Sequence, residues 1–123
     1  MDKKILVVED ESSLQNAMKE FLLAEHFTVA VASDGEEAMR KVKSEKPDLI
    51  LLDIVLPKKD GFEVLAEIKA DEMWAKIPVI LLTNLESADD VDKAFSLGVN
   101  TYLVKSNYKL EEIVGKIKEM LKI

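Results

Sequence analysis

Five short apolar runs, each followed by a polar break and an amphipathic segment, constrain the fold of this chain more than any other feature. The runs are rich in aliphatic and β-branched residues and lie at residues 4–8, 27–32, 48–53, 77–83 and 101–105. Continuous apolar runs of this length are typical of parallel strands, whose two faces are both covered. Because these runs alternate with helices and crossovers are right-handed, the pattern predicts an α/β protein, a doubly wound three-layer sandwich.

Between the runs, apolar residues recur three and four positions apart, which is the spacing of an amphipathic helix. The first helix is expected from Leu14, with Ser12 or Ser13 as its N-cap. The second is expected to follow a cap at Ser33 or Asp34. Three further helices are expected at residues 62–70, 87–96 and 110–121.

The size and charge of the chain exclude several classes of protein. A length of 123 residues suits one domain, and we expect residues 1–123 to contain no separate output domain. The net charge of −7 argues against direct nucleic-acid binding, which needs a basic face. The apolar runs are far shorter than the roughly 20 residues that span a bilayer, so we expect no membrane insertion. The absence of cysteine excludes disulfides and thiolate metal sites and fits a cytoplasmic location.

An acidic residue ends the third apolar run. Asp53 follows four consecutive apolar residues, and burying a carboxylate there costs several kcal/mol unless a partner or a metal compensates. The carboxyl ends of parallel strands meet at one edge of a sheet, where ligands bind. The polar residues that follow the runs and are expected at this edge are Glu9, Asp10, Glu11, Asp53, Thr83 and Lys105.

This combination of side chains suggests metal binding and phosphoryl transfer. Clustered carboxylates repel one another, so they must protonate or bind a cation. Oxygen ligands without His or Cys suit a hard ion, above all Mg2+. Such an ion attracts an anionic phosphoryl group, whose charge Thr83 and Lys105 are placed to share. A carboxylate can be the nucleophile that forms an aspartyl-phosphate, and Asp53, the only acid at the carboxyl end of its strand, is the best candidate.

Four segments carry these residues in order along nearly the whole chain: KILVVEDE, PDLILLDIVLPKKDGFEVL, IPVILLT and YLVK. In sequence and spacing they resemble the receiver domain of two-component response regulators, the fold of the chemotaxis response regulator. The resemblance implies a flavodoxin-like (βα)5 fold with a five-stranded parallel sheet of order 2-1-3-4-5. It identifies residues 1–123 as a receiver domain.

The resemblance also implies a role for each site residue. Asp53 is the expected phosphoacceptor, and Thr83 and Lys105 are expected to contact the phosphoryl oxygens. Tyr102 occupies the position of an aromatic switch that swings inward when Thr83 is drawn toward the phosphate. The expected ligands of Mg2+, or of Mn2+ in its place, are Glu9, Asp10, Asp53 and the backbone carbonyl of Val55.

By the same resemblance, the chain is a phospho-accepting signalling switch. A sensor histidine kinase or a phosphotransfer protein is the expected donor to Asp53, and a downstream protein is expected to bind the face of the fourth helix, fifth strand and fifth helix. We expect a monomer or weak dimer that slowly hydrolyses its own aspartyl-phosphate and turns over no separate substrate. Two alternatives stay open: a fragment of a longer regulator with a DNA-binding output domain, and a degenerate receiver that only binds partners.

Two features depart from the usual family pattern. Lys105 precedes Ser106, where the family usually has a proline after a cis bond, so either this bond is trans or strain is tolerated. Val55 and Leu85 stand where fast-hydrolysing relatives often have polar residues that orient water. We therefore expect slow self-dephosphorylation.

Two other classes fit the same architecture less well. A nucleotide or flavin carrier needs a Gly- or Ser/Thr-rich loop after the first strand, where this chain has EDES, which would repel a phosphate. A phosphohydrolase with an aspartyl intermediate usually has a second Asp two residues after the nucleophile, where this chain has Val55.

Overall fold

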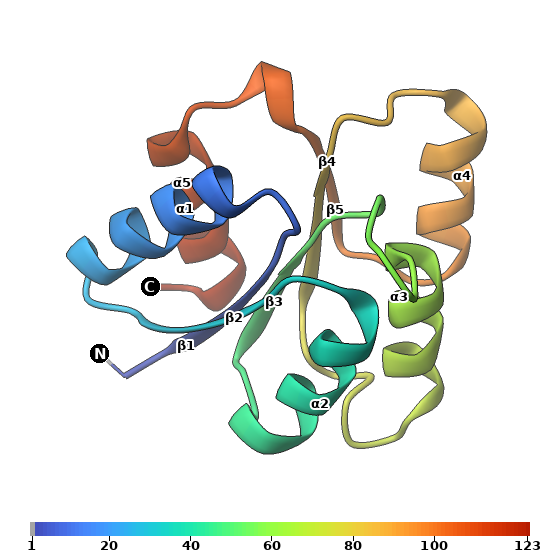
Figure 1. The fold of residues 1–123 in the computed structure, drawn as a ribbon, viewed down its shortest axis with the longest axis horizontal. Coiled ribbons are helices and arrows are strands. Elements are labelled where there is room, and N and C mark those ends of the chain that lie inside the picture. The colour runs from blue at the N-terminus through green and yellow to red at the C-terminus, as the bar shows by residue number, and fades with distance from the viewer. Residues whose placement is uncertain (1) are drawn as a thin grey trace.

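In a computed structural model that describes residues 2–123, all strands form one parallel sheet in the order β2-β1-β3-β4-β5 (Figure 1). The strands are β1 (Lys4–Val8), β2 (Thr28–Ala32), β3 (Leu49–Leu52), β4 (Val79–Thr83) and β5 (Thr101–Val104). The helices are α1 (Ser12–Ala24), α2 (Gly35–Glu45), α3 (Gly61–Ala70), α4 (Ala88–Ser96), the 3-10 helix η1 (Lys105–Asn107) and α5 (Leu110–Leu121). This topology confirms the doubly wound, flavodoxin-like fold expected from the sequence.

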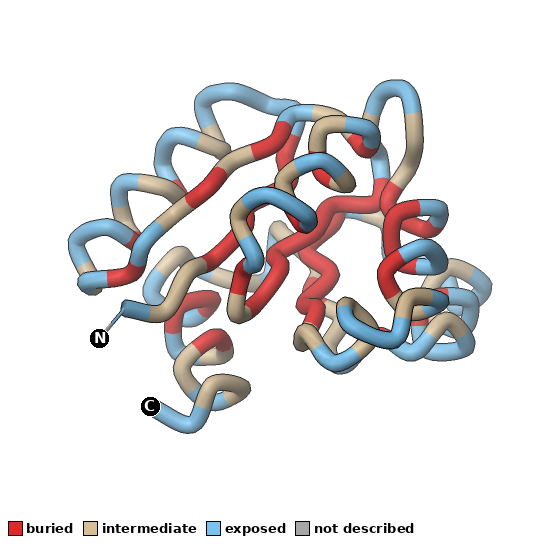
Figure 2. The backbone as a smooth tube through the Cα atoms, turned by 90° about the horizontal axis from the view of Figure 1, so that it is seen from below, coloured by how far each residue is buried: buried red, intermediate tan, exposed pale blue. Residues whose placement is uncertain are grey.

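Two layers of helices cover the sheet, with α1 and α5 on one face and α2, α3 and α4 on the other (Figure 1). Each layer encloses its own core. Because successive residues of a strand point to opposite faces, Val7 belongs to the core with Met18 of α1, and Val8 to the core with Leu65 of α3. Figure 2 shows buried residues along the central strands and exposed residues on the outer sides of the helices. Within residues 2–123, no helix has both the length and the hydropathy needed to cross a membrane.

The register of the sheet determines which residues meet at its carboxyl edge. Val8 of β1 pairs with Leu52 of β3. The residues that follow them, Glu9 and Asp53, therefore emerge side by side. The Asp53 N–H donates to the Val8 carbonyl at 3.1 Å, which extends the contact between these strands by one residue.

The neighbouring strands bring two further residues to the same edge. Thr83 at the end of β4 pairs with Val104 at the end of β5. Lys105 follows directly, but it begins the 3-10 helix and does not belong to the strand, which corrects the expected fifth strand by one residue. This turn leads the chain away from the sheet toward α5.

One of the two N-cap predictions is wrong. α1 begins at Ser12 after Glu11, and no side chain caps it, so neither Ser12 nor Ser13 has the expected role. Asp34 caps α2 as expected, since its carboxylate accepts a hydrogen bond from the Glu37 N–H at 2.8 Å. α3 and α4 each begin one residue from the expected start, a difference common at helix boundaries.

Candidate functional site

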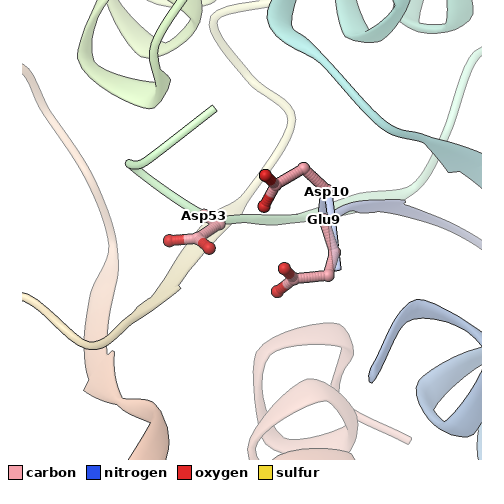
Figure 3. A group of neighbouring side chains, drawn as sticks. All are labelled: Glu9, Asp10 and Asp53. Carbon is pink, nitrogen blue, oxygen red and sulfur yellow. The ribbon is translucent and has the colours of Figure 1, made fainter. Parts of the chain in front are cut away.

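Three carboxylates meet at the carboxyl edge of the sheet. Glu9 and Asp10 follow β1, Asp53 follows β3, and one oxygen of each lies within 4.8 Å of the others. Figure 3 shows the three side chains extending toward the same side of the strand ends. The fold thus confirms that these acids are gathered at one place, as the order of the strands predicts.

The backbone holds the Asp53 carboxylate in a fixed orientation. Only 5% of Asp53 is exposed. Its Oδ1 accepts hydrogen bonds from the N–H groups of Ile54 at 2.7 Å and Val55 at 3.4 Å. The start of α3 packs tightly against the backbone of Asp53. A Cβ atom at Gly61 would lie only 2.3 Å from the Asp53 carbonyl oxygen. Only glycine fits this close approach without a shift of the backbone.

Lys105 bridges two of the acids. Its Nζ lies 2.6 Å from Oε1 of Glu9 and 2.7 Å from Oδ2 of Asp53. All described peptide bonds are trans, including the one between Lys105 and Ser106. The trans backbone therefore brings the ammonium into the site without the proline that is usual in the family.

The charges of the site are unbalanced. Burial raises the pKa of Glu9, and the hydrogen bond from Lys105 offsets this effect only in part. Burial lowers the pKa of Lys105, but its hydrogen bonds to Asp53 and Glu9 outweigh burial, so the net pKa is raised and the ammonium stays charged. One ammonium faces three carboxylates, and with all three ionised an excess of two negative charges remains.

This donor set fits a divalent cation. The pocket at this edge is lined by Glu9, Asp10, Glu11, Asp53, Val55, Thr83, Asn84 and Lys105. Its candidate ligands are oxygen atoms, as hard cations prefer, and its excess negative charge matches the charge of such an ion. Glu9 is buried whereas Asp10 is exposed, so the cluster reaches from the interior to the solvent. Asn84 also lines the pocket, and only its place directly after Thr83 could have pointed to it.

Thr83 and Tyr102 are linked through the segment after β4. Thr83 is fully buried, and its Oγ1 accepts a hydrogen bond from the Leu85 N–H at 3.4 Å. The Tyr102 hydroxyl donates to the Leu85 carbonyl at 2.7 Å. Burial raises the pKa of Tyr102, so the phenol stays protonated and keeps its donor. One residue, Leu85, therefore contacts both side chains to which the family resemblance assigns the switch.

Sequence reasoning missed Gln15, which lies next to the site on α1. Its side chain makes hydrogen bonds to Glu9, Ala32 and Ser33. A signal was present, since Gln15 precedes the buried Met18 by three positions and so occupies the inward face of an amphipathic helix. A polar residue on an inward face needs a hydrogen-bonding partner.

Comparison with protein families and curated proteins gives consistent matches. The model of the response regulator receiver domain matches residues 5–118. The transcriptional regulatory protein CiaR of Streptococcus pneumoniae is 43% identical over 119 residues, which cover 97% of this chain and 51% of CiaR. The chain spans about half the length of the curated relatives it matches.

Two solved structures are similar in fold and sequence. The Mn(2+)-bound form of the response regulator Rcp1 is 39% identical with a TM-score of 0.83, and the match covers 94% of this chain and 91% of that chain. The phosphorylated cyanobacterial phytochrome response regulator RcpA is 40% identical with a TM-score of 0.85, and the match covers 97% of this chain and 93% of that chain.

Proposed function

This chain belongs to the response regulator receiver domain family, and we propose that it is a signalling switch in which Asp53 accepts a phosphoryl group. The observation that carries the proposal is the contact between Asp53 and Lys105 beside two further acids. A buried carboxylate with a fixed orientation and an adjacent ammonium has the features of a phosphoryl acceptor. The similar structure of RcpA is that of a phosphorylated response regulator, which supports this role.

The proposed donor is a phosphohistidine on a sensor kinase or a phosphotransfer protein. A carboxylate oxygen of Asp53 attacks the phosphorus atom, a P–O bond forms, and the P–N bond to the imidazole breaks. The imidazole nitrogen keeps the electron pair of the broken bond. Lys105, already beside the acceptor carboxylate, is placed to contact the phosphoryl oxygens and to offset their charge.

We assign the cation to the same pocket. Glu9, Asp10 and Asp53 would hold it, with the backbone carbonyl of Val55 as a further ligand. A bound Mg2+, or Mn2+ in its place, would act as a Lewis acid that offsets the negative charge of the site. The Mn(2+)-bound form of Rcp1 supports this choice of ion class.

The proposed output is a change in the segment between β4 and α4. A phosphoryl group on Asp53 attracts the Thr83 hydroxyl, and Leu85 connects this movement to Tyr102. The face formed by α4, β5 and α5 then has a different affinity for a downstream protein. A difference of a few kcal/mol between two states is enough for such a switch.

The activity of the whole regulator is part of the proposal. CiaR and the other curated relatives are about twice as long as this chain, and CiaR is described as transcriptional. We therefore keep both a stand-alone receiver that acts on a partner protein and a receiver joined to a DNA-binding domain. In either form we propose slow self-hydrolysis of the aspartyl-phosphate and no turnover of a separate substrate.

Incubation with acetyl phosphate and Mg2+ tests the proposal. We expect the intact mass of the protein to rise by one phosphoryl group, and Asp53→Asn to abolish the increase. Asp2→Asn is the matched control, because Asp2 is exposed and lies outside the site, and it should be labelled like the wild type. A wild type that takes up no phosphoryl group supports the degenerate receiver, and steady hydrolysis of phosphate esters supports a phosphohydrolase.

A further inference from the structure

We infer that Gln15 is a positioning residue of this site, whose side-chain amide fixes the end of β1 from which Glu9 and Asp10 project. The inference rests on the proposed function, because it assigns Gln15 to the cation site proposed above. Gln15 itself contributes no ligand to the cation. It acts through the backbone of Glu9.

The Gln15 amide joins three elements. Its Nε2 donates to the carbonyl of Glu9 at 2.8 Å, to the carbonyl of Ala32 at 3.1 Å and to Oγ of Ser33 at 3.2 Å. Glu9 follows β1, and Ala32 ends the adjacent strand β2. The Glu9 N–H also donates to the Ala32 carbonyl at 3.0 Å. One side chain therefore ties the first turn of α1 to the ends of β1 and β2.

This position requires a donor. Two of the three acceptors are backbone carbonyls, which cannot donate, so only a side chain with N–H or O–H groups can make hydrogen bonds to them. The Glu9 carbonyl lies at the boundary between strand and helix, where a backbone group has no regular partner in the ladder. Removal of the Gln15 amide leaves the carbonyl of the buried Glu9 without its side-chain donor.

Gln15 also links the first turn of α1 to the residues that precede the helix. No side chain caps α1, although a helix N-terminus commonly relies on one to fix its first turn. The backbone N–H of Gln15 donates to the Glu11 carbonyl at 2.9 Å, and its side chain reaches back to Glu9. Residues 9–11, which include two of the three clustered acids, are therefore held between β1 and Gln15.

The expected effect of Gln15 on cation binding follows from this arrangement. Groups that orient metal ligands without touching the metal typically change metal affinity by about 10–100-fold when mutated. Gln15 acts on the backbone of Glu9 and leaves its carboxylate to Lys105, so we expect a change near the lower end, about tenfold.

Gln15→Met and Asn16→Met test this inference. Methionine has nearly the length of glutamine but no donor, and Asn16 is the exposed next residue of the same helix. The probe is Mn2+ alone, titrated into the full chain without a phosphoryl donor. Electron paramagnetic resonance measures the free Mn2+. The temperature is one at which circular dichroism shows that each variant is folded. Backbone amide shifts of residues 9–11 in metal-free protein give a second readout. If Gln15→Met does not fold, Gln15→Asn, whose shorter amide cannot reach all three acceptors, takes its place.

We expect the dissociation constant of Mn2+ to rise about tenfold in Gln15→Met, with shifted amide signals at residues 9–11, and to change less than twofold in Asn16→Met. A purely structural role of Gln15 would lower the unfolding midpoint and leave the Mn2+ affinity of the folded variant unchanged, which would overturn the inference. Equal weakening in both variants would overturn it too. A wild type that binds no Mn2+ would remove the proposed cation site itself, and with it the role of Gln15.

Discussion

Lys105 Nζ lies 2.7 Å from Oδ2 of Asp53, although the two residues follow strands that are not neighbours in the sheet. β4 separates β3 from β5, so the lysine side chain reaches across one strand to make this contact. Their side chains are only 14% and 6% exposed. Lys105 and Asp53 therefore form a buried ion pair in which each charge is compensated by the other. The same ammonium also contacts Glu9.

Lys105→Met should destabilise the metal-free protein. The substitution keeps the length of the side chain but leaves the carboxylates of Glu9 and Asp53 without their cation. We expect the free energy of unfolding to fall by about 1–3 kcal/mol, the cost of buried groups left unsatisfied. Added Mg2+ should recover more stability in this variant than in the wild type, because a bound cation takes over the neutralisation of the carboxylates.

Urea denaturation followed by circular dichroism, with and without Mg2+, measures both effects. Lys76→Met is the control, since Lys76 is exposed and outside the site. Equal stability of the Lys105 and Lys76 variants in metal-free buffer would show that the contacts of Lys105 with Glu9 and Asp53 do not stabilise the fold.

Tyr102→Phe should separate phosphoryl acceptance from its transmission. The variant lacks the hydrogen bond to the Leu85 carbonyl, which should cost about 0.5–1.5 kcal/mol of stability. Phosphorylation of Asp53 should proceed as in the wild type, because Tyr102 does not line the pocket. The change that phosphorylation causes in the Leu85 amide signal should be reduced, as measured by nuclear magnetic resonance.

The second tyrosine of the chain provides the control for this variant. Tyr108→Phe should respond to phosphorylation like the wild type. If Tyr102→Phe shows the full wild-type shift at Leu85, Tyr102 has no part in transmission.

The aspartyl-phosphate should be long-lived because Val55 and Leu85, which lie two residues after Asp53 and Thr83, are apolar. Val55 is 59% exposed and lines the pocket, and its side chain offers no group to orient an attacking water. Val55→Asn supplies such a group and should shorten the lifetime several-fold. The decay of the phosphorylated mass after removal of acetyl phosphate measures this lifetime, with the exposed Leu23→Asn as control. A wild-type half-life of seconds in Mg2+ would contradict the expectation.

Alanine at two glycines should have opposite effects on stability. A Cβ at Gly61 would lie 2.3 Å from the Asp53 carbonyl oxygen, so Gly61→Ala must shift either the start of α3 or the backbone at Asp53. We expect this shift to lower the free energy of unfolding by about 1–3 kcal/mol. Nothing lies within 4 Å of a Cβ at Gly115 inside α5, so Gly115→Ala should stabilise by about 0.5–1 kcal/mol. Chemical denaturation measures the free energy of unfolding of both variants. A less stable Gly115→Ala, or a Gly61→Ala as stable as the wild type, would contradict the expectation.

The fold and the position of the acids followed from local pattern, because each apolar run has the length and composition of a buried strand. Once the runs are parallel strands, Glu9 and Asp53 must share one edge, and they do. The N-cap of α1 could not be predicted in this way. Two serines precede the first apolar helical residue, but the chain turns into helix at Ser12, and Gln15 ties the first turn to the sheet.

The contacts that depend on long side chains were the least predictable part of the site. Lys105 follows the fifth strand, and sequence alone does not say whether its ammonium points toward Asp53 or toward solvent. The trans bond before Ser106 and the start of a 3-10 helix at Lys105 decide its position. Gln15 is similar, because its role depends on the distance between α1 and the ends of two strands.

The site of phosphoryl attachment is the most direct test of the central claim. After reaction with acetyl phosphate and Mg2+, borohydride reduction converts a phosphorylated aspartate to homoserine, and tandem mass spectrometry of the peptides identifies the position. The account predicts homoserine at residue 53 and at no other aspartate. Homoserine at Asp10 or at another aspartate, with Asp53 intact, would contradict it.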